Sequence, residues 1–292
     1  MRLLDRILES IARHRPLESA RLADLSLRSA FAVARLADGS IGSAANFDAE
    51  PSASVRFLPL VPAIEQTLRE SLSGDPALLG VTGEAAAPYL RALRVAIISA
   101  LSQALLTSEC LRPYGLAVAQ EPDFGARIAG LVRPGDVVTV IGFGGPWSGL
   151  LKTRAAAVQI CDFSLSQPRK ASRVAAAIAV RRARTGFAGE VLLSGGEDAG
   201  ELLARSTVVS ITGSALCNDT MEGLLRDSCR CREVIIQGPS ASVFPVELFA
   251  RRATRLFTTR KSPIELAMAR QGGSTIFEVV DRDYIRIERS DP

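Results

Sequence analysis

Histidine is nearly absent from this chain: one occurs in 292 residues, and aromatic residues make up only 5% of the total. The one histidine, His14, lies among arginines in the opening segment. A single imidazole cannot build a histidine-rich metal centre, and nothing places it in a Ser/His/Asp arrangement. The aromatic residues do not interleave with the arginine clusters at 181–184 and 251–255, as base stacking requires. We therefore expect no nucleic-acid partner.

Cysteines and long apolar runs are also scarce. The cysteines are odd in number and widely spaced, which argues against a disulfide framework and for a reducing compartment: Cys110, Cys161, Cys217, Cys229 and Cys231. The most apolar run, residues 95–106, is too short to span a bilayer and contains polar residues. Asp5 and Glu9 interrupt the apolar pattern of the opening segment, unlike a signal peptide. We expect a cytoplasmic protein with no membrane partner.

What remains is an ordinary globular composition, with 47% hydrophobic residues, 23% charged residues and a net charge of +4. In the first part of the chain, apolar residues at helical spacing predict a helix over residues 3–11. Asp38-Gly39 between two apolar runs predicts a hairpin. Two helices should follow, over residues 62–73 and 88–107. This pattern indicates an α+β domain over residues 1–120.

The pattern changes near residue 121, where we place the start of a second domain that runs to residue 292. Short β-branched runs alternate with helical stretches and predict strands at 137–141, 156–161, 207–212, 234–236 and 255–259. A helix should cover residues 264–270, and residues 284–287 should form an edge strand. The overall prediction is an α/β fold, with the α+β domain followed by a Rossmann-like domain with a parallel sheet.

Two loops rich in glycine and serine follow neighbouring strands of this second domain. The first contains Thr212-Gly213-Ser214 and, a few residues on, Asn218 and Thr220; the second is Gly238-Pro239-Ser240. Because the carboxyl ends of parallel strands share one edge of the sheet, both loops should face one ligand site. A helix amino-terminus with hydroxyl and amide donors would suit a carboxylate or phosphate. The alternative is helix capping, since Asp219 and Glu222 have the spacing of a capping box.

A third loop resembles the first turn of a nucleotide-binding fold. Gly142 and Gly144 follow a strand, and Asp162 lies 20 residues after Gly142, where a ribose-binding carboxylate would stand. The third glycine of the dinucleotide pattern is replaced by Trp147. The loop could therefore accept an adenosyl compound, or its glycines could only permit a tight turn.

Two further features allow more than one interpretation. Cys217 lies in the predicted site and is either a thiolate with a lowered pKa or a small residue that fills a gap. Residues 169–184 contain six basic residues and no acidic residue. They should form a basic surface helix, a dimer contact or a membrane-surface helix. With the apolar strip of the opening helix, they lead us to expect a homodimer.

Four stretches of the chain resemble a bacterial and archaeal family named for heavy-metal chelation: PGDVVTVIGFGG, STVVSITGSALCNDTMEGLL, VIIQGPSASVFP and LRVAIISALSQALL. Its members join an enolase amino-terminal-like domain to a Rossmann-like domain. The resemblance implies a ligand site at the domain interface. The matching positions are Gly142, Gly144, Thr212, Gly213, Ser214, Asn218, Thr220, Gly238, Pro239 and Ser240. This chain departs from the family at Ser99 and Asp162, and residues 169–189 look like an insertion.

Two functions follow from these observations. In the first, the protein binds a small anionic metabolite or its metal complex in the interdomain cleft, in heavy-metal handling or chelation. In the second, it is an enzyme of small-molecule metabolism that uses an adenosyl cofactor at Gly142 and Asp162. The cofactor would be a divalent metal ion or an adenosyl compound. The absence of an evident base or nucleophile favours binding.

Overall fold

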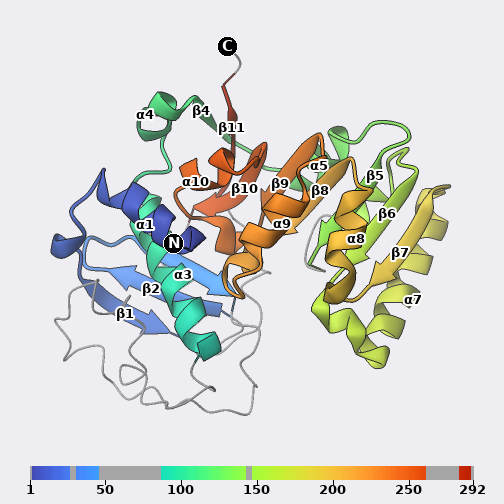
Figure 1. Ribbon diagram of the computed structural model, residues 1–292, viewed down its shortest axis with the longest axis horizontal. Coiled ribbons are helices and arrows are strands. Elements are labelled where there is room, and N and C mark those ends of the chain that lie inside the picture. Colours follow the sequence, from blue (N-terminus) through green and yellow to red (C-terminus); the bar gives the residue numbers. More distant parts are fainter. Residues whose placement is uncertain (1, 27–30, 46–86, 143–146, 261–282, 291–292) are drawn as a thin grey trace.

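The computed structural model describes residues 2–26, 31–45, 87–142, 147–260 and 283–290. In this part of the chain the strands form two sheets, one of three strands and one of eight (Figure 1). The smaller sheet is antiparallel and the larger is mixed, so the predicted α/β class is confirmed. The predicted helices at 62–73 and 264–270, and Gly144, lie outside the described residues.

The smaller sheet has the order β1-β2-β3 and contains the predicted hairpin. Its strands are β1 (Leu22–Ser26), β2 (Phe31–Leu36) and β3 (Ile41–Ala45). Asp38 accepts a hydrogen bond from the Ser40 N–H at 2.9 Å, and Gly39 adopts a φ of 88°, which favours glycine. Helix α3 (Ala87–Gln103) packs against β2 and β3. From Ala92 onward its side chains are apolar on most faces, and the fold buries them, as the sequence predicts.

The larger sheet has the order β4-β11-β10-β9-β8-β5-β6-β7. Its strands in chain order are β4 (Leu116–Gln120), β5 (Val137–Ile141), β6 (Ala157–Cys161), β7 (Glu190–Ser194), β8 (Val208–Thr212), β9 (Glu233–Gln237), β10 (Arg255–Arg260) and β11 (Asp283–Arg289). The six strands from β10 to β7 are parallel to one another.

Strand β11 corrects one prediction, because it is not an edge strand. It runs antiparallel between β10 and β4, and β4 takes the edge. The sequence analysis did not predict β4, whose residues 116–120 pair with β11 and cover the side that an edge strand would leave open. The domain boundary at residue 120 stays a prediction, and β4, which ends at Gln120, belongs to the larger sheet.

The order of the parallel strands reverses between β5 and β8. The chain runs from β5 through β6 to β7 on one side, and then from β8 through β9 to β10 on the other. This is the strand order 3-2-1-4-5-6 of the doubly wound dinucleotide-binding folds. Ligands in such sheets bind outside the carboxyl ends of the strands at the reversal, which here means β5 and β8.

Helices cover both faces of this sheet (Figure 1). Short α5 (Phe124–Gly130) and α6 (Trp147–Leu150) and long α7 (Pro168–Thr185) share a core with one face. Helices α8 (Ala199–Ala204), α9 (Met221–Asp227) and α10 (Val246–Ala250) share the other core with α3 and α1 (Leu3–Ala12). One further helix, α4 (Ser108–Leu111), and six single turns complete the described elements: η1 (Leu17–Ser19), η4 (Arg112–Tyr114), η5 (Phe163–Ser166), η6 (Gly196–Asp198), η7 (Gly213–Leu216) and η8 (Pro239–Ala241).

The two apolar strips behind the dimer prediction have different surroundings. Helix α1 buries Leu3, Leu4, Ile7 and Ile11 against the rest of the chain, including α3 and α10. Helix α7 buries Val174 and Ile178, whereas Val180 is 55% exposed. The strip on α1 is therefore used within one chain, and the homodimer stays a prediction. In the described residues no single helix is long and apolar enough to cross a membrane, although Arg91–Gln103 and Ser108–Tyr114, bent by 100°, qualify together.

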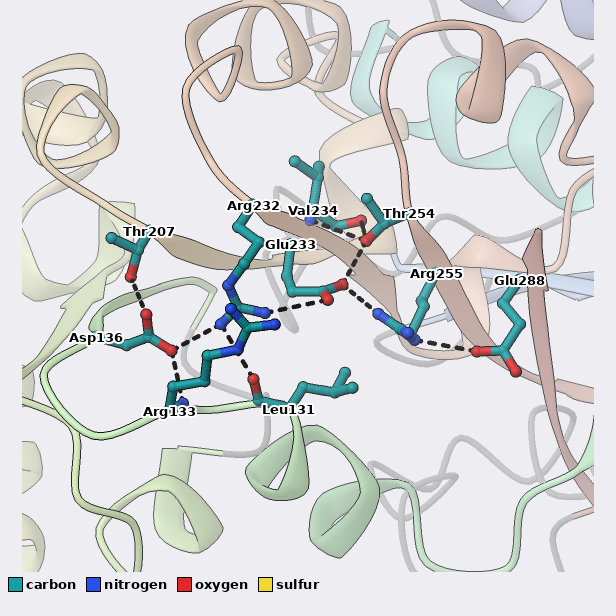
Figure 2. A network of polar contacts seen from close by, with 10 residues as sticks. All are labelled: Leu131, Arg133, Asp136, Thr207, Arg232, Glu233, Val234, Thr254, Arg255 and Glu288. Atoms are coloured by element: carbon teal, nitrogen blue, oxygen red, sulfur yellow. Dashed lines mark hydrogen bonds and ion pairs between the residues drawn. The ribbon is translucent and has the colours of Figure 1, made fainter. Parts of the chain in front are cut away.

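A network of ion pairs joins the amino ends of the parallel strands (Figure 2). Arg232 lies at its centre, 2.8 Å from Asp136 Oδ2 and 3.3 Å from Glu233 Oε1. Arg255 continues it from Glu233 to Glu288, whose Oε2 lies 3.0 Å from Arg255 Nε. The network lies at the amino ends of the strands, at the edge of the sheet opposite to the one where ligands bind. We therefore infer that it stabilises the fold.

Candidate functional site

The reversal between β5 and β8 brings Gly142 against Thr212. Gly142 has a φ of 94°, and a Cβ on it would lie 2.6 Å from Thr212 Cγ2. Its N–H donates to the Cys161 carbonyl at 2.8 Å, which continues the sheet beyond β5. Any larger residue here would be strained and would also displace Thr212. Glycine is therefore required at the turn, whether or not a ligand binds.

The loops after β8 and β9 also meet. A Cβ on Gly213 would lie 2.4 Å from Ala241 N, so η7 and η8 pack backbone to backbone. The predicted convergence of the loops at Gly142, Thr212 and Gly238 is thus confirmed. This packing requires glycine at position 213, because the side chain of a valine there would separate the two loops. A Gly213→Val substitution would therefore disturb the loop packing as well as any ligand site, and its effect on binding alone could not be measured.

Two polar residues on the sheet itself were missed by the sequence reasoning. Gln237, the last residue of β9, is the cross-strand partner of Thr212 and only 3% exposed. No hydrogen bond joins its side-chain amide to the described residues. Ser210 of β8 is fully buried, and its hydroxyl also has no hydrogen-bond partner. Because β-strand side chains alternate, Ser210, Thr212 and Gln237 lie on the same face of the sheet.

The signal for these residues was present in the sequence. Ser210 interrupts the run VVSIT and Gln237 ends the run VIIQ, in strands buried on both faces. Buried polar groups in proteins are almost always paired, so the unpaired Ser210 hydroxyl near the ligand edge indicates a missing partner. Sequence alone does not reveal pairing, because the partners of a buried hydroxyl come from neighbouring strands.

Several predicted site residues have structural roles. Ser240 Oγ accepts a hydrogen bond from Ala45 N at 2.9 Å, which joins η8 to the end of β3. Ser214 is buried, and its hydroxyl lies 3.1 Å from Thr212 Oγ1. Gly238 adopts a φ of 105°, and Pro239 begins η8. These residues shape the loops that border Thr212 and Gln237.

Asn218 and Thr220 lie at the surface rather than in the buried set. Asn218 Oδ1 accepts hydrogen bonds from Thr220 N at 3.3 Å and Thr220 Oγ1 at 2.7 Å, a local turn. The capping box expected from Asp219 and Glu222 is wrong. Helix α9 begins at Met221 without a side-chain cap, because Asp219 has a φ of 60° and its carboxylate lies 3.7 Å from Arg2.

Asp162 stands at the end of β6, the strand beside β5. Its Oδ1 accepts a hydrogen bond from Ser164 N at 2.8 Å, which starts η5. The next residue, Phe163, is 61% exposed. Burial, followed by the carboxylates of Asp198, Asp162 and Glu197, raises the pKa of the Cys161 thiol to about 12. The ends of β6 and β7 are therefore acidic, in contrast to the uncharged set on β8 and β9.

Comparisons with known proteins agree with this geometry. Residues 128–279, more than half of the chain, match the model of a family described as DUF364, "Putative heavy-metal chelation". The chain belongs to the DUF364 family. A comparison with curated proteins gave no match.

Two solved structures of DUF364 proteins have the same fold. One, of unknown function, comes from Pyrococcus horikoshii; it is 18% identical, covers 98% of each chain and has a TM-score of 0.61. The other, also of unknown function, comes from Desulfitobacterium hafniense DCB-2; it is 16% identical, covers 98% of each chain and has a TM-score of 0.63. At this identity the likeness shows the fold alone.

This DUF364 chain does not provide a metal centre from its own described residues, where no group of three or more His, Cys, Asp or Glu side chains could hold an ion. The residues around Thr212 and Gln237 are hydroxyls and an amide, which bind transition metals poorly.

The cysteine of the predicted site in this DUF364 protein is not a thiolate. Burial raises the pKa of the Cys217 thiol to about 12, although hydrogen bonding with Ala45 and Ser240 opposes the shift. The interpretation of Cys217 as a reactive thiol is wrong, because η7 places it in the core between the two sheets. It fills space there, as the alternative interpretation stated.

Thiol labelling of the native protein at pH 8 checks this assignment. We expect a single fast-reacting cysteine, Cys229, because it is the exposed one. With a pKa of about 12, only roughly one Cys217 thiol in ten thousand is ionised at that pH. The replacement Cys229→Ser should remove the fast phase of the reaction with a chromogenic disulfide. Fast labelling of Cys217, identified by peptide mapping, would contradict its placement.

Proposed function

We propose that this protein binds a small anionic metabolite, or the complex of such a metabolite with a metal ion, at the carboxyl ends of β5, β8 and β9. The observation that carries the proposal is the fully buried Ser210 hydroxyl, which has no hydrogen-bond partner and lies on the same face of the sheet as Thr212 and Gln237. Leaving such a group unpaired costs about 1–3 kcal/mol. A ligand that supplies the missing partners removes this cost.

The chemistry of the set suits a carboxylate or a similar oxyanion. Ser210, Thr212 and Gln237 offer hydroxyl and amide donors in a desolvated place, where hydrogen bonds to an anion are strong. On the other side of η7, Arg91 of α3 brings a positive charge and donates a hydrogen bond to the Cys217 carbonyl at 3.1 Å. The family description supports a metal-related role, and a metabolite carboxylate would also be a ligand of the metal ion.

The variant Ser210→Ala tests the proposal, because a ligand-binding hydroxyl and a structural one respond oppositely. With no ligand present, we expect this variant to melt at a higher temperature than the wild type, since it removes an unpaired buried hydroxyl. We expect it to bind less tightly by about 1–3 kcal/mol. The probes are citrate, nickel citrate and nickel ion alone, compared by thermal shift and calorimetry. Citrate and its complex should stabilise the protein, and nickel alone should not.

A matched control is Ser43→Ala in β3. The Ser43 hydroxyl is likewise fully buried and without a hydrogen-bond partner, but it lies in the smaller sheet. This variant should also melt higher while keeping the affinity of the wild type. If Ser210→Ala lowered the melting temperature and left citrate affinity unchanged, the hydroxyl would be structural and the proposal would fail.

A further inference from the structure

Phe163 is an aromatic ring left open to solvent at the ligand edge of the sheet. It is 61% exposed, and among the described residues only Val180 is another large hydrophobic residue exposed to a similar extent. The ring packs on the backbone of Gly196, where a Cβ would lie 2.3 Å from Phe163 Cδ1. Backbone thus supports one side of the ring and fixes its position. The exposed side offers a flat apolar surface of the size of a nucleobase.

The ring lies where doubly wound folds bind a nucleoside. It follows Asp162 at the end of β6, the second strand from the reversal, where doubly wound folds place the carboxylate that binds ribose hydroxyls. The end of β8, with Thr212, lies two strands away, roughly 10 Å at the usual spacing of strands. A nucleoside with a short 5′ substituent spans that distance.

We infer that the protein binds an adenine nucleoside at the carboxyl ends of β6, β5 and β8. Its base stacks on Phe163, its ribose faces Asp162, and its anionic 5′ substituent reaches Thr212 and Gln237. The inference rests on the proposed function and names the class of metabolite. It has a second, independent support at the far end of the ligand. There the buried Ser210 hydroxyl, which has no hydrogen-bond partner, needs the polar atoms that a phosphate or carboxylate supplies.

The groups around the ring select the base. The Glu197 side chain folds over Gly195, since a Cβ on Gly195 would lie 2.2 Å from Glu197 Oε1. The neighbouring Asp198 accepts a hydrogen bond from Ser194. Carboxylates accept hydrogen bonds and do not donate them. The exocyclic amino group of adenine can donate to them, whereas the carbonyl oxygen at the same position of hypoxanthine is repelled. Adenine is therefore preferred over hypoxanthine.

Calorimetry with adenosine and inosine 5′-monophosphates tests this inference. We expect the wild type to bind the adenine nucleotide more tightly than the inosine nucleotide. Phe163→Ala should weaken binding of the adenine nucleotide about 5- to 150-fold, the usual effect of losing one stacked base. Because the ring is exposed, the variant should keep the fold, and Phe163→Tyr should restore the affinity. The matched control is Val180→Ala on α7, which should bind as the wild type does.

Each result decides the inference. Equal affinity of Phe163→Ala and wild type, or a preference for the inosine nucleotide, would overturn it. If neither nucleotide binds at millimolar concentration while citrate still binds and still depends on Ser210, the nucleoside is wrong and the proposed function stands. If neither nucleotides nor citrate bind, the proposed function fails with it.

Discussion

Replacing Gly42 by alanine is expected to lower the free energy of unfolding by about 3 kcal/mol or more. Gly42 lies in β3 where α3 crosses the smaller sheet. A Cβ on this residue would lie 2.1 Å from Ala96 O and 2.2 Å from Ala100 N. Both atoms belong to the backbone of α3, so no side-chain rotation can relieve the overlap. The helix would have to move off the sheet and open the core between them.

The control for Gly42→Ala is Gly130→Ala. Gly130 is the last residue of α5, and a Cβ there has no atom within 4 Å. Alanine favours helix over glycine by about 1 kcal/mol, so this variant should be as stable as the wild type or slightly more stable. Urea unfolding followed by circular dichroism measures both variants. A Gly42→Ala protein of wild-type stability would show that α3 does not approach β3 this closely.

Replacing Arg232 by methionine is expected to destabilise the protein by about 2–3 kcal/mol at pH 7. The side chain of Arg232 is 29% exposed, and those of its partners Asp136 and Glu233 are 10% and 13% exposed. Removing the guanidinium leaves the poorly hydrated carboxylate of Asp136 without its cation, whereas Glu233 keeps its ion pair with Arg255 (Figure 2). The partial exposure of Arg232 keeps the effect below the 3–5 kcal/mol or so of a fully buried pair.

The effect of Arg232→Met should depend on pH. Burial alone would raise the pKa of Asp136, but hydrogen bonds from Arg133 N and the Thr207 hydroxyl, with the Arg232 guanidinium, outweigh it and hold the pKa below its ordinary value. A lowered folded-state pKa contributes stability above the ordinary Asp pKa of about 3.9, and this stability is lost as the pH falls through the folded pKa. Protonation removes the charge that Arg232 neutralises. The difference between wild type and variant should therefore shrink as the pH falls below about 4.

Urea unfolding at pH 7 and at acidic pH measures this difference. The control is Arg226→Met, which removes an ion pair with Asp227 at 3.0 Å in which the arginine side chain is 78% exposed. An exposed pair of this kind contributes less than about 1 kcal/mol, so the control should show little change at either pH. A difference for Arg232→Met that grew at low pH would contradict the role assigned to Asp136.

The predictions that succeeded from the sequence rest on local patterns. Asp38-Gly39 between apolar runs forms the predicted hairpin, and residues 169–184 lie within the predicted helix, α7. The loops after β8 and β9 converge because the parallel strands that carry them are neighbours in the sheet. The capping box at Asp219 and Glu222 failed although its spacing was right, since the φ of 60° at Asp219 turns the chain differently.

The sequence by itself determined the hairpin, the central strands β5, β6, β8, β9 and β10, the long helices α3 and α7, the family and the edge of the sheet where the loops meet, but it did not predict β1, β4 or β7. The predicted elements follow from the period of apolar residues and from turn residues, which act over a few positions of the chain. The tertiary structure decided which buried groups are left without partners. In the sequence Ser210 is an ordinary polar residue, and only the neighbouring strands show that nothing pairs with its hydroxyl. It also placed β11 inside the sheet and Cys217 in the core. Pairing, burial and pKa depend on residues far apart in the sequence, because desolvation and hydrogen bonding act through space.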